Sequence, residues 1–113
     1  MSLNLEENYN TSIFRIKGKL VGGSLGTEFS QMLHDQLDKG RKNFVVDMSN
    51  VGFISSSGLG ILISGLTSAK KSGGDLKLAG ISSKMEGLLS ITKLDQIFEQ
   101  YKSVEQAVDS YNQ

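Results

Sequence analysis

The segment from residue 43 to residue 62 constrains the fold more than any other part of the chain. Residues 43–47 form a short apolar run with two valines and a phenylalanine, which is typical of a strand covered on both faces. A helical stripe follows it, with apolar residues at Leu59, Leu62, Ile63, Leu66 and Ala69. The segment therefore predicts a buried strand and then a helix.

Polar residues and glycines join these two elements. The residues that interrupt the apolar pattern are Asp47, Ser49, Asn50 and Gly52. We therefore expect a loop over residues 47–52. Ser55, Ser56 and Ser57 stand just before the helical stripe, where serine is a favoured N-cap. A helix start also favours added negative charge, because free N–H groups and the positive dipole end gather there. Each serine is therefore a candidate cap or a candidate phosphate acceptor.

Length and composition exclude several classes of protein. The chain has 113 residues, which predicts one domain spanning residues 1–113. Twelve basic and twelve acidic residues cancel, which argues against nucleic-acid or anionic-membrane binding. The absence of cysteine and the single histidine exclude thiolate and multi-histidine metal sites. No apolar run approaches the roughly 20 residues of a membrane helix, and no signal peptide is recognisable, so we expect a cytoplasmic protein.

Alternating strand and helix patterns predict an α/β fold. Strands are expected at residues 4–7, 12–18, 43–47, 76–80 and 96–101. Helices are expected over residues 25–39, after the serines, after Ser83 and after Ser103. Ser24 is the expected cap of the first, and capping-box spacing makes Ser83 and Ser103 the expected caps of the last two. The order β-β-α-β-α-β-α-β-α predicts a mixed, mostly parallel sheet of four to five strands with about four helices. We expect an opening antiparallel hairpin, the first strand at an edge, and the helices mainly on one face.

Known catalytic motifs do not fit the serine turn. Gly58 and Gly60 begin a dinucleotide fingerprint, but Ile63 occupies the place of its third glycine. The chain has no Gly-Lys-Ser/Thr of a phosphate loop, and glycines do not flank the serines as a nucleophile elbow requires. His34, the only imidazole, lies in another predicted helix. We therefore expect a protein that is not an enzyme and that uses no cofactor.

Residues 45–62 resemble the signature of the STAS domain, the family of anti-sigma factor antagonists and sulfate transporter tails. The resemblance also includes the turn at residues 18–20, the segment 73–82 and the tail at 101–107, so it covers nearly the whole chain. It implies the STAS fold. Since no transmembrane segment is recognisable, the chain resembles the stand-alone bacterial antagonists.

The resemblance also implies a mechanism, in which phosphorylation controls a switch between partners. The unmodified antagonist binds an anti-sigma factor that is also a serine kinase of the histidine-kinase-like ATPase class, and sigma factor is released. The kinase then phosphorylates a serine that corresponds to Ser56, with Ser55 and Ser57 as rival acceptors, and a serine phosphatase reverses the modification. The implied partner-binding residues are Val21, Gly22, Gly23, Ser24, Ser55, Ser56, Ser57, Gly58, Leu59 and Leu62.

Two positions depart from the common family pattern. Many phosphorylated members have aspartate before the acceptor and after the leucine of the second-strand turn, where this chain has Ser55 and Val21. Two other functions stay open. One is a subunit of a lipid-transport or other regulatory assembly without a phosphorylation switch, and the other is binding of a small ligand such as a nucleotide. The oligomeric state, monomer or weak dimer, also stays open.

Overall fold

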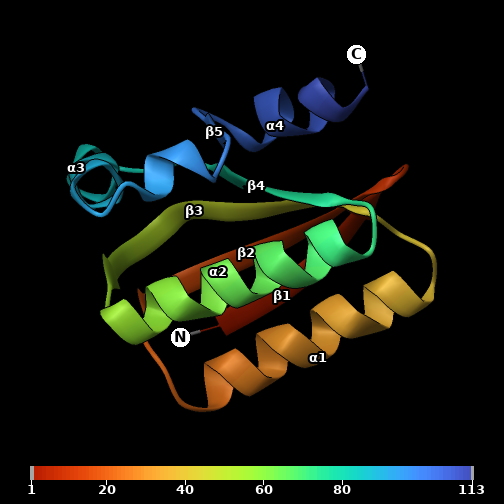
Figure 1. The fold of residues 1–113 in the computed structure, drawn as a ribbon, viewed down its shortest axis with the longest axis horizontal. Coiled ribbons are helices and arrows are strands. Elements are labelled where there is room, and N and C mark those ends of the chain that lie inside the picture. The colour runs from red at the N-terminus through yellow and green to blue at the C-terminus, as the bar shows by residue number, and fades with distance from the viewer. Residues whose placement is uncertain (1, 113) are drawn as a thin grey trace.

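The computed structural model describes residues 2–112. Its five strands form one sheet in the order β1-β2-β3-β4-β5 (Figure 1). The strands are β1 (Ser2–Asn8), β2 (Thr11–Leu20), β3 (Asn43–Ile54), β4 (Asp75–Ala79) and β5 (Gln100–Tyr101). Strand β1 runs antiparallel to β2, and all other neighbours are parallel. This confirms the expected mixed sheet with its opening hairpin and with the first strand at an edge.

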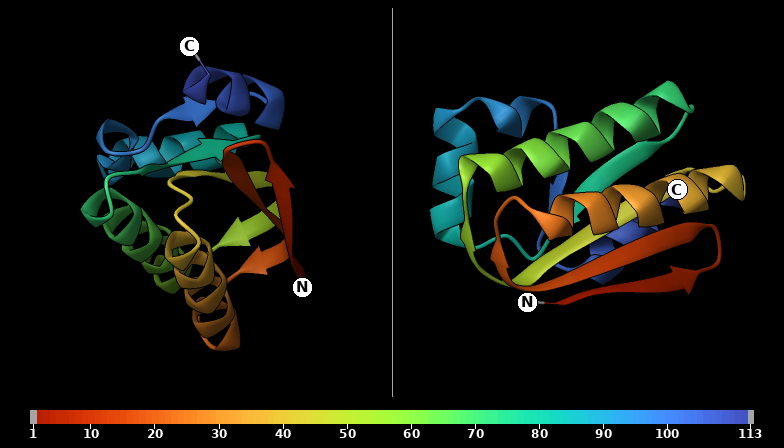
Figure 2. Two further views of the ribbon diagram at one scale, coloured as in Figure 1. Left: turned by 90° about the vertical axis from the view of Figure 1, so that its right-hand side faces the viewer. Right: turned by 90° about the horizontal axis from the view of Figure 1, so that it is seen from below.

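The helices alternate with the strands in the predicted order. They are α1 (Ser24–Asp38), α2 (Ser56–Lys71), α3 (Ser83–Ile91) and α4 (Val104–Tyr111), with a short 3-10 helix, η1 (Leu94–Gln96), before β5. Helices α1 and α2 lie side by side on one face of the sheet, and α4 lies on the opposite face (Figure 2). No helix within residues 2–112 combines the length and the apolar character that crossing a bilayer requires.

Most helices lie on one face, as expected, and α4 is the exception. Side chains alternate along β3, so that Phe44 and Val46 enter the apolar cluster beneath α1, α2 and α3, which we call the main core. Val45 points the other way and packs with Ala107 and Val108 of α4 in a second cluster. Because β3 is apolar on both sides, it needs a helix on each face.

Aromatic rings and a close helix contact organise the main core. The ring of Phe14 lies edge-on to Phe29, with 5.0 Å between centroids, and stacks with Phe44 at 6.0 Å. A Cβ atom on Gly65 would lie only 2.8 Å from the Phe29 ring, so α2 approaches α1 more closely than a larger residue would allow.

A buried lysine attaches α4 to the opposite face of the sheet. Lys77 of β4 donates a hydrogen bond to Ser110 Oγ at 2.7 Å, and its ammonium lies 4.0 Å from the ring centre of Tyr111. Its carboxylate partner is Glu99, at 3.7 Å. The Tyr111 hydroxyl is shared between the carbonyl oxygens of Phe44, at 2.8 Å, and Asp75, at 3.0 Å. Burial raises the pKa of Tyr111, so this hydroxyl keeps its proton and remains a donor.

The predicted loop over residues 47–52 was wrong, because β3 continues to Ile54. The side chain of Asp47 is buried, yet its charge is compensated. Arg15 donates to Asp47 Oδ2 at 2.7 Å, and the Ser49 hydroxyl and N–H donate to Oδ1 at 2.6 and 3.0 Å. A paired carboxylate can stay in a strand where an unpaired one could not.

Several predicted boundaries also moved. Gly23, at φ 86°, occupies the N-cap position of α1, and Ser24 is already helical. Ser82, rather than Ser83, caps α3 by accepting from Met85 N–H at 3.3 Å. The last strand contains only Gln100–Tyr101, because residues 94–96 form η1. The predicted cap of α4 is confirmed, since Ser103 Oγ accepts from Gln106 N–H at 3.2 Å.

We predict that Tyr111→Phe lowers the free energy of unfolding by about 1–2 kcal/mol, because two carbonyl oxygens lose their shared donor. Chemical denaturation measures the change. Tyr9→Phe is the matched control, since Tyr9 is 93% exposed at the tip of the β1–β2 hairpin, and it should stay within about 0.5 kcal/mol of the wild type. Equal effects of the two variants would contradict the attachment of α4 through Tyr111.

Candidate functional site

Two loops meet at the carboxyl edge of the sheet, where the predicted site residues lie. Strands β2 and β3 are parallel neighbours, and their last residues, Leu20 and Ile54, are paired. The N–H of Ser55 donates to the carbonyl oxygen of Leu20 at 3.0 Å, which joins the two strand ends directly. A Cβ atom built on Gly22 would lie 3.1 Å from the Cβ of Ser57. The loop after β2 and the serine turn after β3 therefore form one continuous surface.

The three serines have different roles at the start of α2. Ser55 is the N-cap, with extended backbone, and its Oγ accepts from Gly58 N–H at 3.0 Å. Its carbonyl oxygen accepts from Leu59 N–H at 2.9 Å. Ser56 and Ser57 are the first two helical residues, and both are exposed. Within residues 2–112 neither of their hydroxyls has a side-chain hydrogen bond, so the cap role belongs to Ser55 alone.

The two glycines near the serines serve different purposes. A Cβ atom on Gly58 would collide with the carbonyl oxygen of Leu20 and would lie 2.9 Å from its carbonyl carbon. Gly58 therefore permits the close approach between α2 and the end of β2. Gly60 is exposed and has open space where its Cβ would lie. The position of α2 does not require a glycine there.

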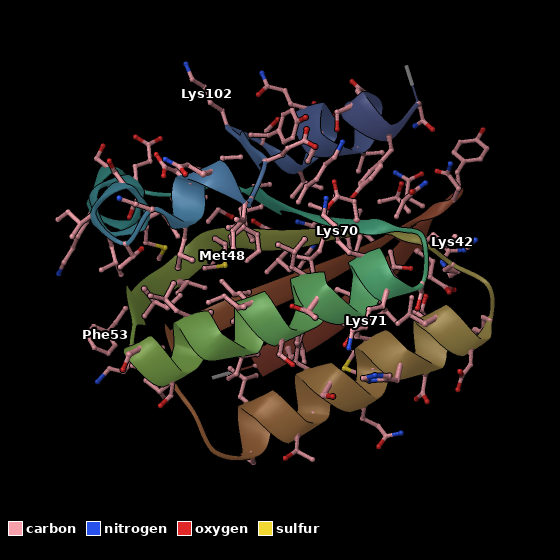
Figure 3. All side chains as sticks on the ribbon, in the orientation of Figure 1. Lys42, Met48, Phe53, Lys70, Lys71 and Lys102 are labelled. Carbon is pink, nitrogen blue, oxygen red and sulfur yellow. The ribbon has the colours of Figure 1, made fainter. Side chains whose placement is uncertain are left out.

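The surface around the serines carries almost no charge. The sequence contains no acidic or basic residue from residue 48 to residue 69. Helix α2 has no acidic residue in its first turn, and its basic residues, Lys70 and Lys71, lie in the last turn, at the opposite end of the helix from Phe53 (Figure 3). The positive end of the α2 dipole at Ser56 is therefore not offset by a carboxylate of that turn.

The predicted partner-binding residues divide into exposed and buried groups. Gly23, Ser24, Ser56 and Ser57 are exposed, and Val21, Gly22 and Ser55 are half-buried. Gly58, Leu59 and Leu62 are buried, and the last two have their side chains in the main core. Leu62 is only 1% exposed. These buried residues hold the surface in place from below.

Sequence reasoning missed an apolar groove beside the serine turn. It has a volume of about 430 Å³, and we call it the β3–α3 groove. It is lined by Phe53 and Ile54 of β3 and by Lys84, Met85, Leu88 and Ile91 of α3, among others. Phe53 is 48% and Ile91 83% exposed. Ile91 lies three residues after Leu88, so helical spacing puts both on one side of α3, but only the fold places them in one groove with Phe53.

Comparisons with known proteins show the family to which the sequence is similar. The family model that describes the STAS domain matches residues 2–107. The anti-sigma-B factor antagonist of Staphylococcus aureus is 27% identical over 101 residues, which cover 86% of this chain and 91% of that protein.

Solved structures show the same fold. A crystal structure of a candidate anti-sigma factor antagonist from Thermotoga maritima superposes with a TM-score of 0.85 at 26% identity, covering 98% of this chain and 95% of that one. The Bacillus cell fate determinant SpoIIAA in its phosphorylated form has a TM-score of 0.77 at 18% identity, covering 97% and 99% of the two chains.

We predict opposite effects for alanine at the two glycines. Gly58→Ala should lower the free energy of unfolding by about 1–3 kcal/mol or more, because its Cβ meets a backbone oxygen that cannot move aside alone. Gly60→Ala should raise it by about 0.5–1 kcal/mol through higher helix propensity. Thermal melting of the two variants beside the wild type checks both signs. A tolerated Gly58→Ala would contradict the close contact with Leu20.

Alanine variants of Ser55 and Ser56 test which of the two side chains stabilises the start of α2. Ser55→Ala should cost about 1 kcal/mol of folding stability, because the Gly58 N–H loses its acceptor. Ser56→Ala should stay within about 0.5 kcal/mol of the wild type, since the Ser56 side chain is exposed. Urea denaturation measures both, and a larger loss for Ser56→Ala would reverse the assignment.

Proposed function

This chain belongs to the STAS domain family, and we propose that it is an anti-sigma factor antagonist regulated by phosphorylation. In this proposal the unmodified protein binds an anti-sigma factor that is also a serine kinase of the histidine-kinase-like ATPase class. Binding releases the sigma factor, phosphorylation of Ser56 ends the complex, and a serine phosphatase restores it. The protein itself acts in the cytoplasm as one domain, without catalysis.

The observation that carries the proposal is the exposure of Ser56 at the start of a helix whose cap is a different residue. Because Ser55 already satisfies the Gly58 N–H, the Ser56 hydroxyl has no role in holding α2 together. A kinase can therefore reach and modify it without disturbing the helix. The name of the Staphylococcus aureus relative supports the antagonist function. The structure of phosphorylated SpoIIAA is only 18% identical to this chain, so it supports the fold and not the phosphorylation.

The geometry favours Ser56 over the two rival acceptors. The Ser55 side chain is half-buried and accepts the cap hydrogen bond, so modification there would cost the helix its cap. Ser57 is exposed but lies against the loop after β2, next to Gly22. Ser56 has neither restriction.

The charge of the phosphate supplies the switch. A phosphoserine adds about 1.5 to 2 negative charges and three acceptor oxygens at neutral pH. In the free protein the N–H groups and the dipole of α2 stabilise these charges. In a close interface the phosphate loses its water, and burying an unpaired charge is costly. Release of the partner then needs no change of fold.

The exposed part of the surface described above is the proposed docking area. It consists of Gly23, Ser24, Ser56 and Ser57, with Val21 and Gly22 at half exposure. With no charged residue from 48 to 69, the partner must recognise this area by shape, hydrogen bonds and apolar contact. Ser55 and Val21, which replace the common aspartates, contribute to this neutrality.

We predict that Ser56→Asp weakens binding of the anti-sigma factor kinase from the same organism by at least about 30-fold, as expected for one unpaired buried charge. Ser56→Ala should bind like the wild type. Isothermal titration calorimetry measures the affinities, and circular dichroism checks that both variants remain folded. If Ser56→Asp bound as tightly as Ser56→Ala, the switch would be wrong.

Incubation with that kinase and ATP, followed by mass spectrometry, identifies the acceptor. Modification at Ser56 in the wild type and none in Ser56→Ala is the expected result. Co-purification with a transporter ATPase and permease, in place of a kinase, would instead identify a subunit of a lipid-transport assembly.

A further inference from the structure

The β3–α3 groove lies directly beside the proposed docking area. Its residues Phe53 and Ile54 immediately precede Ser55, the cap of α2, so the groove and the serine turn share one stretch of backbone. Figure 3 shows the Phe53 side chain at the outer end of β3, close to the start of α2. A protein that covers Ser56 therefore reaches the mouth of the groove.

Large apolar side chains are exposed in the groove. Ile91 is 83% and Phe53 48% exposed, and Leu88 and Ile54 are half-buried beneath them. Two of the four large apolar side chains that are exposed within residues 2–112 thus line this groove. Apolar side chains gathered in this way on a surface mark a site of association.

The charges around the groove define the chemistry of what binds there. Lys84 lines the groove and is exposed. Lys19 of β2 is paired with Phe53 in the strand register and is also exposed. No acidic residue is among the lining residues that the structure describes. The surface is thus apolar at its centre and positive at its rim, which is complementary to an apolar segment flanked by carboxylates.

We infer that the β3–α3 groove is a second contact area for the same partner, which inserts an apolar side chain between Phe53 and Ile91 and places a carboxylate near Lys84. This inference rests on the proposed function. The groove is formed by β3 and α3, and in this inference it contributes affinity that does not depend on the phosphorylation state of Ser56. The phosphorylation state of the serine turn then controls whether the partner binds, and the groove increases the affinity of the complex.

The central test is the affinity of Ile91→Asp for the anti-sigma factor kinase from the same organism, measured by calorimetry. We expect at least about tenfold weaker binding, because an apolar contact is lost and a charge is buried. Tyr9→Asp is the matched control at another exposed apolar position, on the distant β1–β2 hairpin, and it should bind like the wild type. Thermal melting confirms that both exposed substitutions leave the fold intact.

Charge reversal at the rim tests the chemistry of the partner segment. Lys84→Glu should weaken binding and reduce its dependence on salt concentration, since an attraction screened by salt is removed. Lys102→Glu is the control, because Lys102 is an exposed lysine near β5, away from the groove (Figure 3). An unchanged affinity of Lys84→Glu would overturn the carboxylate contact.

The outcomes distinguish this inference from the proposed function. If the wild type binds, Ser56→Asp does not, and Ile91→Asp is weakened while Tyr9→Asp is not, the second contact area is supported. If Ile91→Asp binds as well as the wild type, the groove is not part of the interface and the switch at Ser56 still stands. If the wild type itself does not bind the kinase, the proposed function and the inference are both overturned.

Discussion

The carbonyl oxygen of Leu20 is the point on which the arrangement of the site depends. It accepts the N–H of Ser55 at 3.0 Å and lies where a Cβ of residue 58 would otherwise be. The first contact fixes the end of β3 beside the end of β2, and the second brings the first turn of α2 against the same strand end. The loop after β2 and the serine turn are therefore one surface because a single backbone oxygen joins them.

This contact also explains why Ser55 caps the helix and Ser56 does not. With the backbone of Ser55 held by Leu20, its side chain is directed to Gly58 N–H and closes the helix start. Ser56 is then the first helical residue, and its side chain is exposed. A helix that needed Ser56 as its cap could not offer that hydroxyl for modification without losing stability.

The sequence predicted the order of the elements, the antiparallel first strand and the helix start at the serines, because these follow from local periodicity and from capping preferences. It failed where distant residues decide. The sequence predicted Asp47 to lie in a loop, because its ion pair with Arg15 of the neighbouring strand cannot be inferred from local pattern. The expected single main helix face did not anticipate α4 on the other side, because the attachment through Lys77 and Tyr111 joins residues far apart in the sequence. The β3–α3 groove was missed for the same reason, since Phe53 and Ile91 line one groove only in the folded chain.

Because the surface around the serines is neutral, phosphorylation would change its charge strongly in the proposed switch. Between residues 48 and 69 the chain has no charged side chain, so a phosphate on Ser56 would be the first charge on this segment. Aspartates at positions 21 and 55 would already impose a negative potential on the partner, and the phosphate would add to a background. With Val21 and Ser55 in those places, the unmodified segment adds no repulsion of its own toward an acidic partner. In the proposed switch the departures from the common family pattern thus leave the binding state neutral, and the phosphate alone makes the segment negative.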